Sequence, residues 1–338
     1  MNATMSPDVK HYPVMLNQLL SILTPQHGGT FIDCTFGGGG YSSAILSYPK
    51  TKVIAIDRDK NVSSLAEKIK KKFPKRFKFI NDKFSSLDQI KDLKIKPKAI
   101  IFDLGFSTHQ IKDHKRGFSF DSSSPLDMRM GKNAISAFDV VNNFTEESLA
   151  WIFKKLGEEK DSKRIAKEIV FKRKNNRIIY ANDLAKIIGR VKKNYFYSKT
   201  NPATKVFQAL RMFVNQEVTE LITGLVSATK LLEKNGKIIV VSFHSIEDRI
   251  IKKYFQTYSN LNSNPSRYVP SEKKNNSKTL FFLKSNSALI PSKDEIIKNR
   301  ASRSAKMRFA VRNENNFFYP DLFADYFRDY LTLEGLRL

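Results

Sequence analysis

The stretch TFIDCTFGGGGYSS (residues 30–43) decides the fold of this chain. Its apolar run ends near the acid Asp33, and four consecutive glycines (residues 37–40) precede a segment that can form a helix. A strand that leads into a glycine turn and a helix N-terminus is where open α/β sheets bind nucleotide-like ligands. Glycine also serves any tight turn that needs a positive φ, so a purely structural turn is the alternative.

The pattern of a short apolar run followed by an acid repeats in the first hundred residues. It recurs in KVIAID (52–57), FKFIND (77–82) and KAIIFDLG (98–105), and residues 61–72 carry apolar side chains at helical spacing. Nearly all-apolar runs of this length are typical of buried parallel strands. Strands that alternate with helices predict an α/β protein with a doubly wound sheet.

A run of helical patterns interrupts this alternation from about residue 112 to residue 199. The segments are FTEESLAWIFKKLG, DSKRIAKEIVFKRK and ANDLAKIIGRVKK. After Asn201-Pro202 we predict one long helix, whose apolar face carries Phe207, Leu210, Val214, Val218 and Leu221. GKIIVVSFHS (236–245) and SAKMRFAVR (304–312) read as further strands, so a helical module is inserted between the fourth and fifth strands.

These patterns predict four parts of the chain. Residues 1–111 form the first part of the sheet domain, 112–200 the inserted helical domain, 201–320 the second part of the sheet domain and 321–338 a C-terminal tail. Residues 259–278 are polar and rich in Asn, Ser and Lys, so they read as a loop or a disordered connector.

Composition bounds the class of protein. The 338 residues are 41% hydrophobic, which is enough for a full core, and the single cysteine, Cys34, excludes a disulfide framework and fits a reducing cytosol. The first residues show no signal-peptide pattern, and no apolar run approaches the roughly 20 residues of a membrane helix. We expect a soluble, cytoplasmic protein.

The net charge is strongly positive. Lys and Arg number 59 against 33 Asp and Glu, which gives +26, and residues 154–199 hold 15 basic against five acidic side chains. Such a field attracts polyanions, of which nucleic acid is the commonest in cells. The alternative is compositional drift toward lysine on solvated faces, since the chain is also rich in Asn, Ile and Phe.

Two acids near the glycines discriminate between ligands. Gly37 and Gly39 match the first two positions of a G-x-G-x-x-G fingerprint, but the third falls on Ser42. Asp57 follows Gly37 by twenty residues, the spacing at which a carboxylate reaches a ribose diol, which suits NAD and S-adenosylmethionine equally. Asp33 would repel a pyrophosphate and attract the ammonium of a methionine moiety, which favours S-adenosylmethionine.

A long polar segment, DLGFSTHQIKDHKRGFSFDSSSPLDMRM (103–130), leaves the end of the fourth predicted strand. It has no metal-ligand spacing, so we expect no metal site and interpret His109 and His114 as loop histidines. Substrate loops belong at this edge of a sheet, and SFHSIED (242–248) leaves the next strand beside it.

Eight motifs resemble one family. They are HYPVMLNQLL, DCTFGGGGYS, AIDRD, FDLGFSTHQI, RGFSF with PLDMRM, NPATKVFQALRMFVNQE, SFHSIEDR and NRASRSAKMR, spread over about residues 11–312. Together they are similar to the RsmH (MraW) family of 16S ribosomal RNA cytosine-N4 methyltransferases. The resemblance implies a class I, Rossmann-like methyltransferase sheet with an inserted all-helical domain and S-adenosylmethionine as cofactor. It implies methylation of a cytidine at N4 in the decoding-centre (P-site) region of 16S rRNA in the small ribosomal subunit.

The resemblance also implies cofactor contacts. Gly39, Gly40 and Tyr41 would line the methionine end, Asp57 would hold the ribose hydroxyls, Phe84 would lie against the adenine, and Asp103 and Gln110 would complete the pocket. A core role is the alternative for Phe84. The chain departs from the family at Tyr41, where His is common, which leaves a backbone contact there. It also departs from the family's usual sequence at Ser107-Thr108-His109, in the loop before Gln110.

The chemistry requires alignment of a weak nucleophile. The N4 lone pair of cytosine is conjugated with its ring, so positioning is the largest contribution, and an acceptor for the N4 proton assists. The candidates are Asp103, Asp127 and His244. Asp127 is favoured because PLDMRM places it beside Arg129, with an ordinary salt bridge as the alternative. Two other classes stay open: a non-catalytic rRNA-binding or assembly factor, and an NAD-dependent oxidoreductase.

Overall fold

The computed structural model describes residues 13–90, 95–105, 116–120, 123–131, 133–192, 201–260 and 279–337. The chain forms two units. The sheet unit comprises Met1–Gly105 and Glu220–Phe323, and the helical unit comprises Phe106–Thr219 and Ala324–Leu338. Each unit is described by itself.

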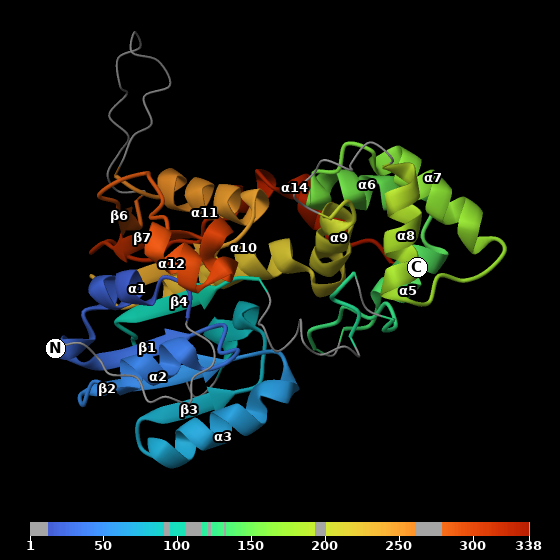
Figure 1. Cartoon of the computed structure of the whole chain (residues 1–338). Coiled ribbons are helices and arrows are strands. Elements are labelled where there is room, and N and C mark those ends of the chain that lie inside the picture. The colour runs from blue at the N-terminus through green and yellow to red at the C-terminus, as the bar shows by residue number, and fades with distance from the viewer. Residues whose placement is uncertain are drawn as a thin grey trace, which may run out of the picture. The chain divides into compact units, whose positions relative to one another are not determined.

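The sheet unit contains one seven-stranded sheet with the order β3-β2-β1-β4-β5-β7-β6 (Figure 1). The strands are β1 (Gly29–Asp33), β2 (Thr51–Ile56), β3 (Phe77–Ile80), β4 (Ala99–Asp103), β5 (Lys237–Ser242), β6 (Phe281–Phe282) and β7 (Lys306–Arg312). β1 to β5 are parallel, whereas β7 is antiparallel to both β5 and β6. This order confirms the predicted α/β class and its class I, Rossmann-like sheet.

Both faces of the sheet are buried, as its apolar strands predict. Phe31, Val53 and Ile101 belong to the core cluster that also contains side chains of α1 and α2. Ile32 and Phe102 alternate with them and are also fully buried. The described helices of this unit are α1 (Leu16–Leu23), α2 (Gly40–Leu46), α3 (Ser63–Lys72), α11 (Ser245–Thr257), α12 (Lys293–Lys298), and most of α10 (Glu217–Leu231) and α13 (Asp321–Asp325).

The helical unit packs its helices over an apolar core. They are α5 (Ala137–Asn143), α6 (Glu146–Gly157), α7 (Ser162–Arg173), α8 (Ala181–Val191), α9 (Thr204–Asn215) and α14 (Arg328–Glu334). A Cβ on Gly157 would lie 2.5 Å from the Lys205 carbonyl oxygen, so glycine permits the close approach of α6 and α9. The three helices expected from the motifs within residues 144–193 are confirmed.

The region after residue 201 differs from the expected single helix. Gln216 adopts a left-handed conformation with φ 52°, which ends α9, and α10 begins at Glu217. The side chain of Asn215 accepts a hydrogen bond from the Met130 N–H and donates to the Met128 carbonyl. These bonds hold the end of α9 against the loop of residues 123–131, which the helical periodicity of α9 does not reveal.

The unit boundaries also differ from the predicted 112–200 insert and 321–338 tail. The helical unit extends to Thr219 and includes the end of the chain from Ala324. The carboxylate of Glu334 accepts hydrogen bonds from the backbone N–H groups of Val218 and Thr219, at 3.0 and 2.8 Å. This contact joins α14 to the start of α10. Burial of Glu334 raises its pKa to about 7.

Several features were not expected from the sequence. These are helices α1 and α12, the short strand β6 and the antiparallel direction of β7. Both helices have a local signal that was missed: Leu16, Leu19 and Leu23 recur at helical spacing in α1, and Ser292 caps the Glu295 N–H of α12. Most of the expected polar connector, residues 261–278, lies outside the described residues. Among the described helices, none is long and apolar enough to cross a membrane.

Candidate functional site at the carboxyl edge of the sheet

The glycine loop follows β1 and is closely packed. Gly37 and Gly39 have positive φ values of 48° and 72°. A Cβ on Gly39 would lie 2.6 Å from the Ile69 side chain, and one on Gly40 would lie 2.3 Å from the Pro13 ring. Glycine is therefore required by packing and by backbone conformation, whatever ligand the loop holds.

Asp33 ends β1 and is only 1% exposed. Its carboxylate accepts a hydrogen bond from the Ser42 hydroxyl at 2.7 Å and one from the Thr35 N–H at 3.3 Å. Burial raises the pKa of Asp33. The observed role of this acid is to tie β1 to α2 across the glycine loop, while the expected attraction of an ammonium group stays a prediction.

Asp57 follows β2 and is half-buried. Its Oδ2 accepts a hydrogen bond from the Gly37 N–H and its Oδ1 accepts one from the Asp59 N–H, both at 2.8 Å. An ionised carboxylate has about four acceptor positions, so each oxygen keeps one for a ligand. Burial raises the pKa of Asp57 to about 6.

Asp103 ends β4, and its carboxylate has an unused acceptor. The Asp103 N–H donates to the Thr35 hydroxyl at 2.7 Å. Its Oδ1 is buried and has no hydrogen-bond partner among the described residues. Burial, followed by the charges of Asp33 and Glu247, raises the pKa of Asp103 well above its usual value. A buried polar atom without a partner is costly, so this oxygen suits a ligand donor.

Phe84 begins the 3-10 helix η3 (Phe84–Gln89), directly after the β3 region. Its ring packs edge-on against Phe102 with centroids 5.3 Å apart. A Cβ on Gly224 would lie 2.5 Å from the same ring, so glycine on α10 makes room for it. Phe84 is only half-buried. One part of the ring is anchored in the core and another part is accessible, which is compatible with the expected contact to adenine.

Of two further expected cofactor residues, the structure leaves one only its backbone for a contact, as expected, and does not describe the other. The hydroxyl of Tyr41 donates to the Val14 carbonyl, and the side chain is buried in the core. Only its backbone is then available to a ligand. Gln110 lies outside the described residues, as do His109 and His114.

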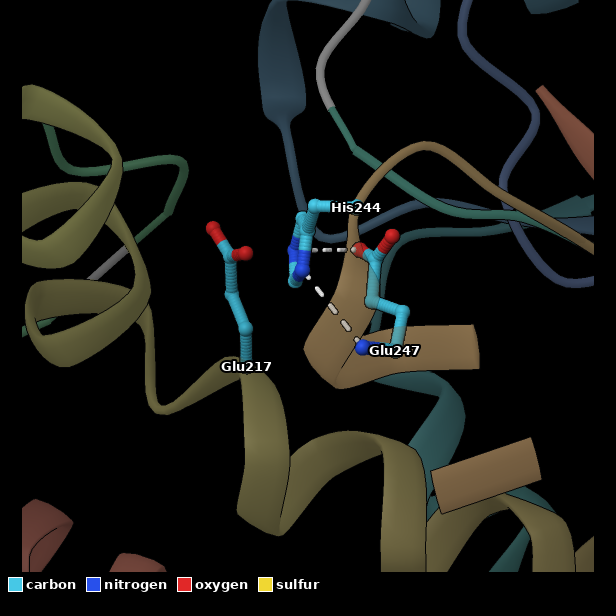
Figure 2. Close-up of side chains that lie close together, drawn as sticks. All are labelled: Glu217, His244 and Glu247. Carbon is cyan, nitrogen blue, oxygen red and sulfur yellow. Dashed lines mark hydrogen bonds and ion pairs between the residues drawn. The ribbon is translucent and has the colours of Figure 1, made fainter. Parts of the chain in front are cut away.

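His244 is the N-cap of α11, where its ring lies against Glu247 (Figure 2). Its Nδ1 accepts a hydrogen bond from the Glu247 N–H at 3.4 Å, and its Nε2 lies 3.1 Å from Glu247 Oε1. Glu247 Oε2 in turn accepts the Phe243 N–H at 2.9 Å. Both ring nitrogens therefore face Glu247. Sequence reasoning did not single out Glu247, although a glutamate three residues after an N-cap is a recognisable signal.

Asp127 belongs to the helical unit and forms a two-pronged ion pair with Arg129. The Arg129 Nε lies 2.6 Å from Oδ1, and a terminal nitrogen lies 2.9 Å from Oδ2. Burial raises the pKa of Asp127, but the hydrogen bonds and charge of Arg129 outweigh it, so the pKa is lowered overall. A carboxylate held in this way is a weak base.

Four of the predicted residues thus follow neighbouring parallel strands. Asp33 pairs with Ala55 of β2 and with Ile101 of β4 in the sheet register, and Asp103 pairs with Val241 of β5. Asp33, Asp57, Asp103 and His244 therefore share one edge of the sheet. A partly buried group of acids in a chain of net charge +26 suits a small ligand that carries positive charge and hydrogen-bond donors.

Comparison with known proteins gives a consistent result. Residues 8–313 match the model of the MraW methylase family. The chain is 42% identical over 301 residues to the ribosomal RNA small subunit methyltransferase H of Rickettsia canadensis (strain McKiel), covering 89% of this chain and 97% of the relative. It is 41% identical over 302 residues to the protein of the same name from Neorickettsia sennetsu (strain ATCC VR-367 / Miyayama), covering 89% and 95%.

A solved structure similar to this chain is that of an rRNA methylase from Streptococcus thermophilus. It is 10% identical, covers 88% of this chain and 96% of that protein, and aligns with a TM-score of 0.38.

Proposed function

The chain belongs to the MraW methylase family, and we propose that it transfers a methyl group from S-adenosylmethionine to N4 of a cytidine in the decoding-centre (P-site) region of 16S rRNA. The names of the curated relatives support methylation of small-subunit rRNA. One observation carries the nucleoside part of the cofactor assignment, and the family membership favours S-adenosylmethionine over NAD. The Asp57 carboxylate is held by the Gly37 and Asp59 amides with one acceptor position left on each oxygen, as a ribose diol requires.

The site fits this cofactor in one further respect, because the buried Asp103 oxygen has no partner among the described residues. S-adenosylmethionine supplies an electrophilic methyl group on a sulfonium and also carries an ammonium. Asp33, Asp57 and Asp103 provide negative charge at the edge where these cations would bind, and Asp103 Oδ1 can accept a donor. The backbone of Gly39, Gly40 and Tyr41, the Phe84 ring and Gln110 would complete the pocket.

Among the three candidates for the proton acceptor, we favour Asp103. Asp127 is neutralised by Arg129, and His244 directs both ring nitrogens toward Glu247. Asp103 Oδ1 is buried without a hydrogen-bond partner in the described part of the chain. His244 Nε2 also has no hydrogen bond there, but it lies 3.1 Å from Glu247 Oε1, whereas no described side chain pairs with Asp103 Oδ1. Its pKa is raised by burial, and a cationic ligand beside it would favour the charged, accepting form.

The exposed lysines of the helical unit are evidence for rRNA as the partner. Lys163, Lys167 and Lys174 lie exposed on or at the end of α7, where they can contact phosphates. A base in a loop is cheaper to extrude into a pocket than a paired one. A non-catalytic assembly factor would bind RNA through the same lysines, so an activity measurement is needed to distinguish it from a methyltransferase. A protein that methylates the rRNA of ribosomal subunits would act in the cytoplasm.

The test is to incubate the protein with labelled S-adenosylmethionine and small subunits that lack the modification, and then digest the rRNA to nucleosides. We expect N4-methylated cytidine, and we expect Asp103→Asn to reduce it strongly while Asp294→Asn, an exposed acid on α12, does not. A protein that binds the subunit without forming this nucleoside would be an assembly factor. Thermal stabilisation by NAD but not by S-adenosylmethionine would indicate the oxidoreductase.

A further inference from the structure

A second buried carboxylate of the sheet unit has an unused oxygen. Glu220, on the first turn of α10, is only 5% exposed. Its Oε1 lies 3.1 Å from the Lys83 ammonium, but its Oε2 is buried without a hydrogen-bond partner in the part of the chain that the structure describes. Leaving such an atom unpaired is costly, so the arrangement calls for a donor that is not part of these residues.

The position of Glu220 is set by one face of α10. Residues 220, 224 and 227 lie on the same side of a helix because they are four and three residues apart. Gly224 accommodates the Phe84 ring, and the Ser227 hydroxyl donates to the Ser85 carbonyl at 3.2 Å. This face therefore holds the segment 83–88, and Glu220 lies one turn before the residue that contacts Phe84.

We propose that Glu220 Oε2 accepts a hydrogen bond from the 6-amino group of the cofactor's adenine and so selects adenine over 6-oxo purines. The proposal rests on the proposed function and deepens it. An adenine that lies against Phe84 presents its edge to the residues flanking this ring, and Lys83 and Glu220 are paired there. An ionised carboxylate only accepts, so it matches an amino group and repels a carbonyl oxygen.

Asp82 is the competing acceptor, because it precedes Phe84 by two residues. It is exposed, and its Oδ1 accepts the Lys83 N–H at 2.7 Å. Water competes for an exposed acceptor, whereas a desolvated one discriminates strongly between donors and acceptors. Selection of the base is therefore assigned to Glu220 and not to Asp82.

The test compares two ligands by calorimetry: S-adenosylhomocysteine and S-inosylhomocysteine, which has a 6-oxo group in place of the 6-amino group. The wild-type protein is expected to prefer the first. In Glu220→Gln the amide can donate to the 6-oxo group, so the ratio of the two affinities is expected to fall at least about tenfold. Ser227→Ala, which loses bonds to the same segment, and Asp82→Asn are expected to keep the wild-type ratio.

The ratio is measured on one protein sample, so partial unfolding of a variant changes both affinities equally. If Glu220→Gln is unfolded, Glu220→Asp provides the second test, since it retracts the oxygen and is also expected to lower the ratio. An unchanged ratio in these variants, or a ratio that moves only in Asp82→Asn, would overturn the proposal. If the wild-type protein binds neither ligand, the proposed function itself fails, which is a distinguishable result.

Discussion

The charged side chains proposed to bind ligands differ in burial between the two units of this protein. In the sheet unit, Asp33 and Glu220 are buried, and Asp103 has a buried carboxylate oxygen at the carboxyl edge of the sheet. In the helical unit, Lys163, Lys167 and Lys174 are exposed. A buried charge needs a specific partner at close range, whereas an exposed charge acts through a screened, long-range field. The sheet edge thus suits one small ligand, and the helical surface suits an extended polyanion.

The helical unit also contains buried charges, among them the ion pair of Lys192 and Glu159. Both side chains are 1% exposed, their charged atoms are 2.5 Å apart, and the Lys192 ammonium also donates to the Pro202 carbonyl at 3.1 Å. Both side chains are buried, like Asp33 and Glu220 of the sheet unit, but here each charge already has an oppositely charged neighbour. It therefore offers a direct way to test whether a buried charge depends on its neighbour.

We expect Lys192→Met to have the largest effect. It leaves the Glu159 carboxylate buried without its cation, which costs about 3–5 kcal/mol of unfolding free energy. Urea unfolding monitored within the helical unit measures this loss. Lys186→Met, which removes an exposed lysine paired with Asp183, is the control and should cost less than about 1 kcal/mol. Equal effects of the two variants would contradict the distinction between buried and exposed charge.

Asp57→Ala tests the sheet edge. It removes both acceptors proposed for the ribose hydroxyls, and charge-assisted hydrogen bonds contribute about 1.5–3 kcal/mol each. The affinity for S-adenosylhomocysteine is expected to fall at least about 100-fold, as measured by calorimetry. Asp294→Ala, which removes an exposed acid of α12, should bind normally. Normal binding by Asp57→Ala would exclude the proposed ribose contact.

The same site predicts a pH dependence. Burial raises the pKa of Asp57 to about 6, and hydroxyl donors favour its ionised form. Affinity for S-adenosylhomocysteine should therefore be retained above pH 6 and fall about tenfold by pH 5, because roughly a tenth of the carboxylate is then ionised. Asp103, with its raised pKa, acts in the same direction. A flat profile between pH 5 and 7.5 would show that neither acid contacts the ligand.

Replacing the three exposed lysines of the α7 region is expected to have the smallest effect per residue. The triple variant of Lys163, Lys167 and Lys174 to Ala should bind rRNA several-fold more weakly and lower the salt slope by up to about 2 units. The matched control removes Lys68, Lys71 and Lys72 from α3, which are equally exposed. If both triple variants lose the same affinity, net charge alone accounts for binding and the helical surface has no special role.

The strands and most helices could be predicted from local patterns because each buries its own apolar side chains. Apolar runs that end near Asp33, Asp57 and Asp103 marked β1, β2 and β4. The twenty-residue spacing from Gly37 predicts Asp57 as a ligand acceptor, and the structure places Asp57 in a hydrogen bond with the Gly37 N–H. The end of α9 at Gln216 could not be predicted in this way. The apolar stripe continues through it, and the break depends on bonds from Asn215 to a distant loop.

The sequence by itself determined the fold class, the edge of the sheet where acids gather and the basic character of the helical region. These follow from periodicity, strand ends and composition, which are properties of neighbouring residues. Only the tertiary structure decided how each side chain is used. Asp33 is tied to Ser42, His244 is turned toward Glu247, and Asp103 and Glu220 each have a buried oxygen that no described residue pairs with. Whether a carboxylate is satisfied depends on residues far away in the chain, because burial and hydrogen bonding arise only when strands and helices pack together.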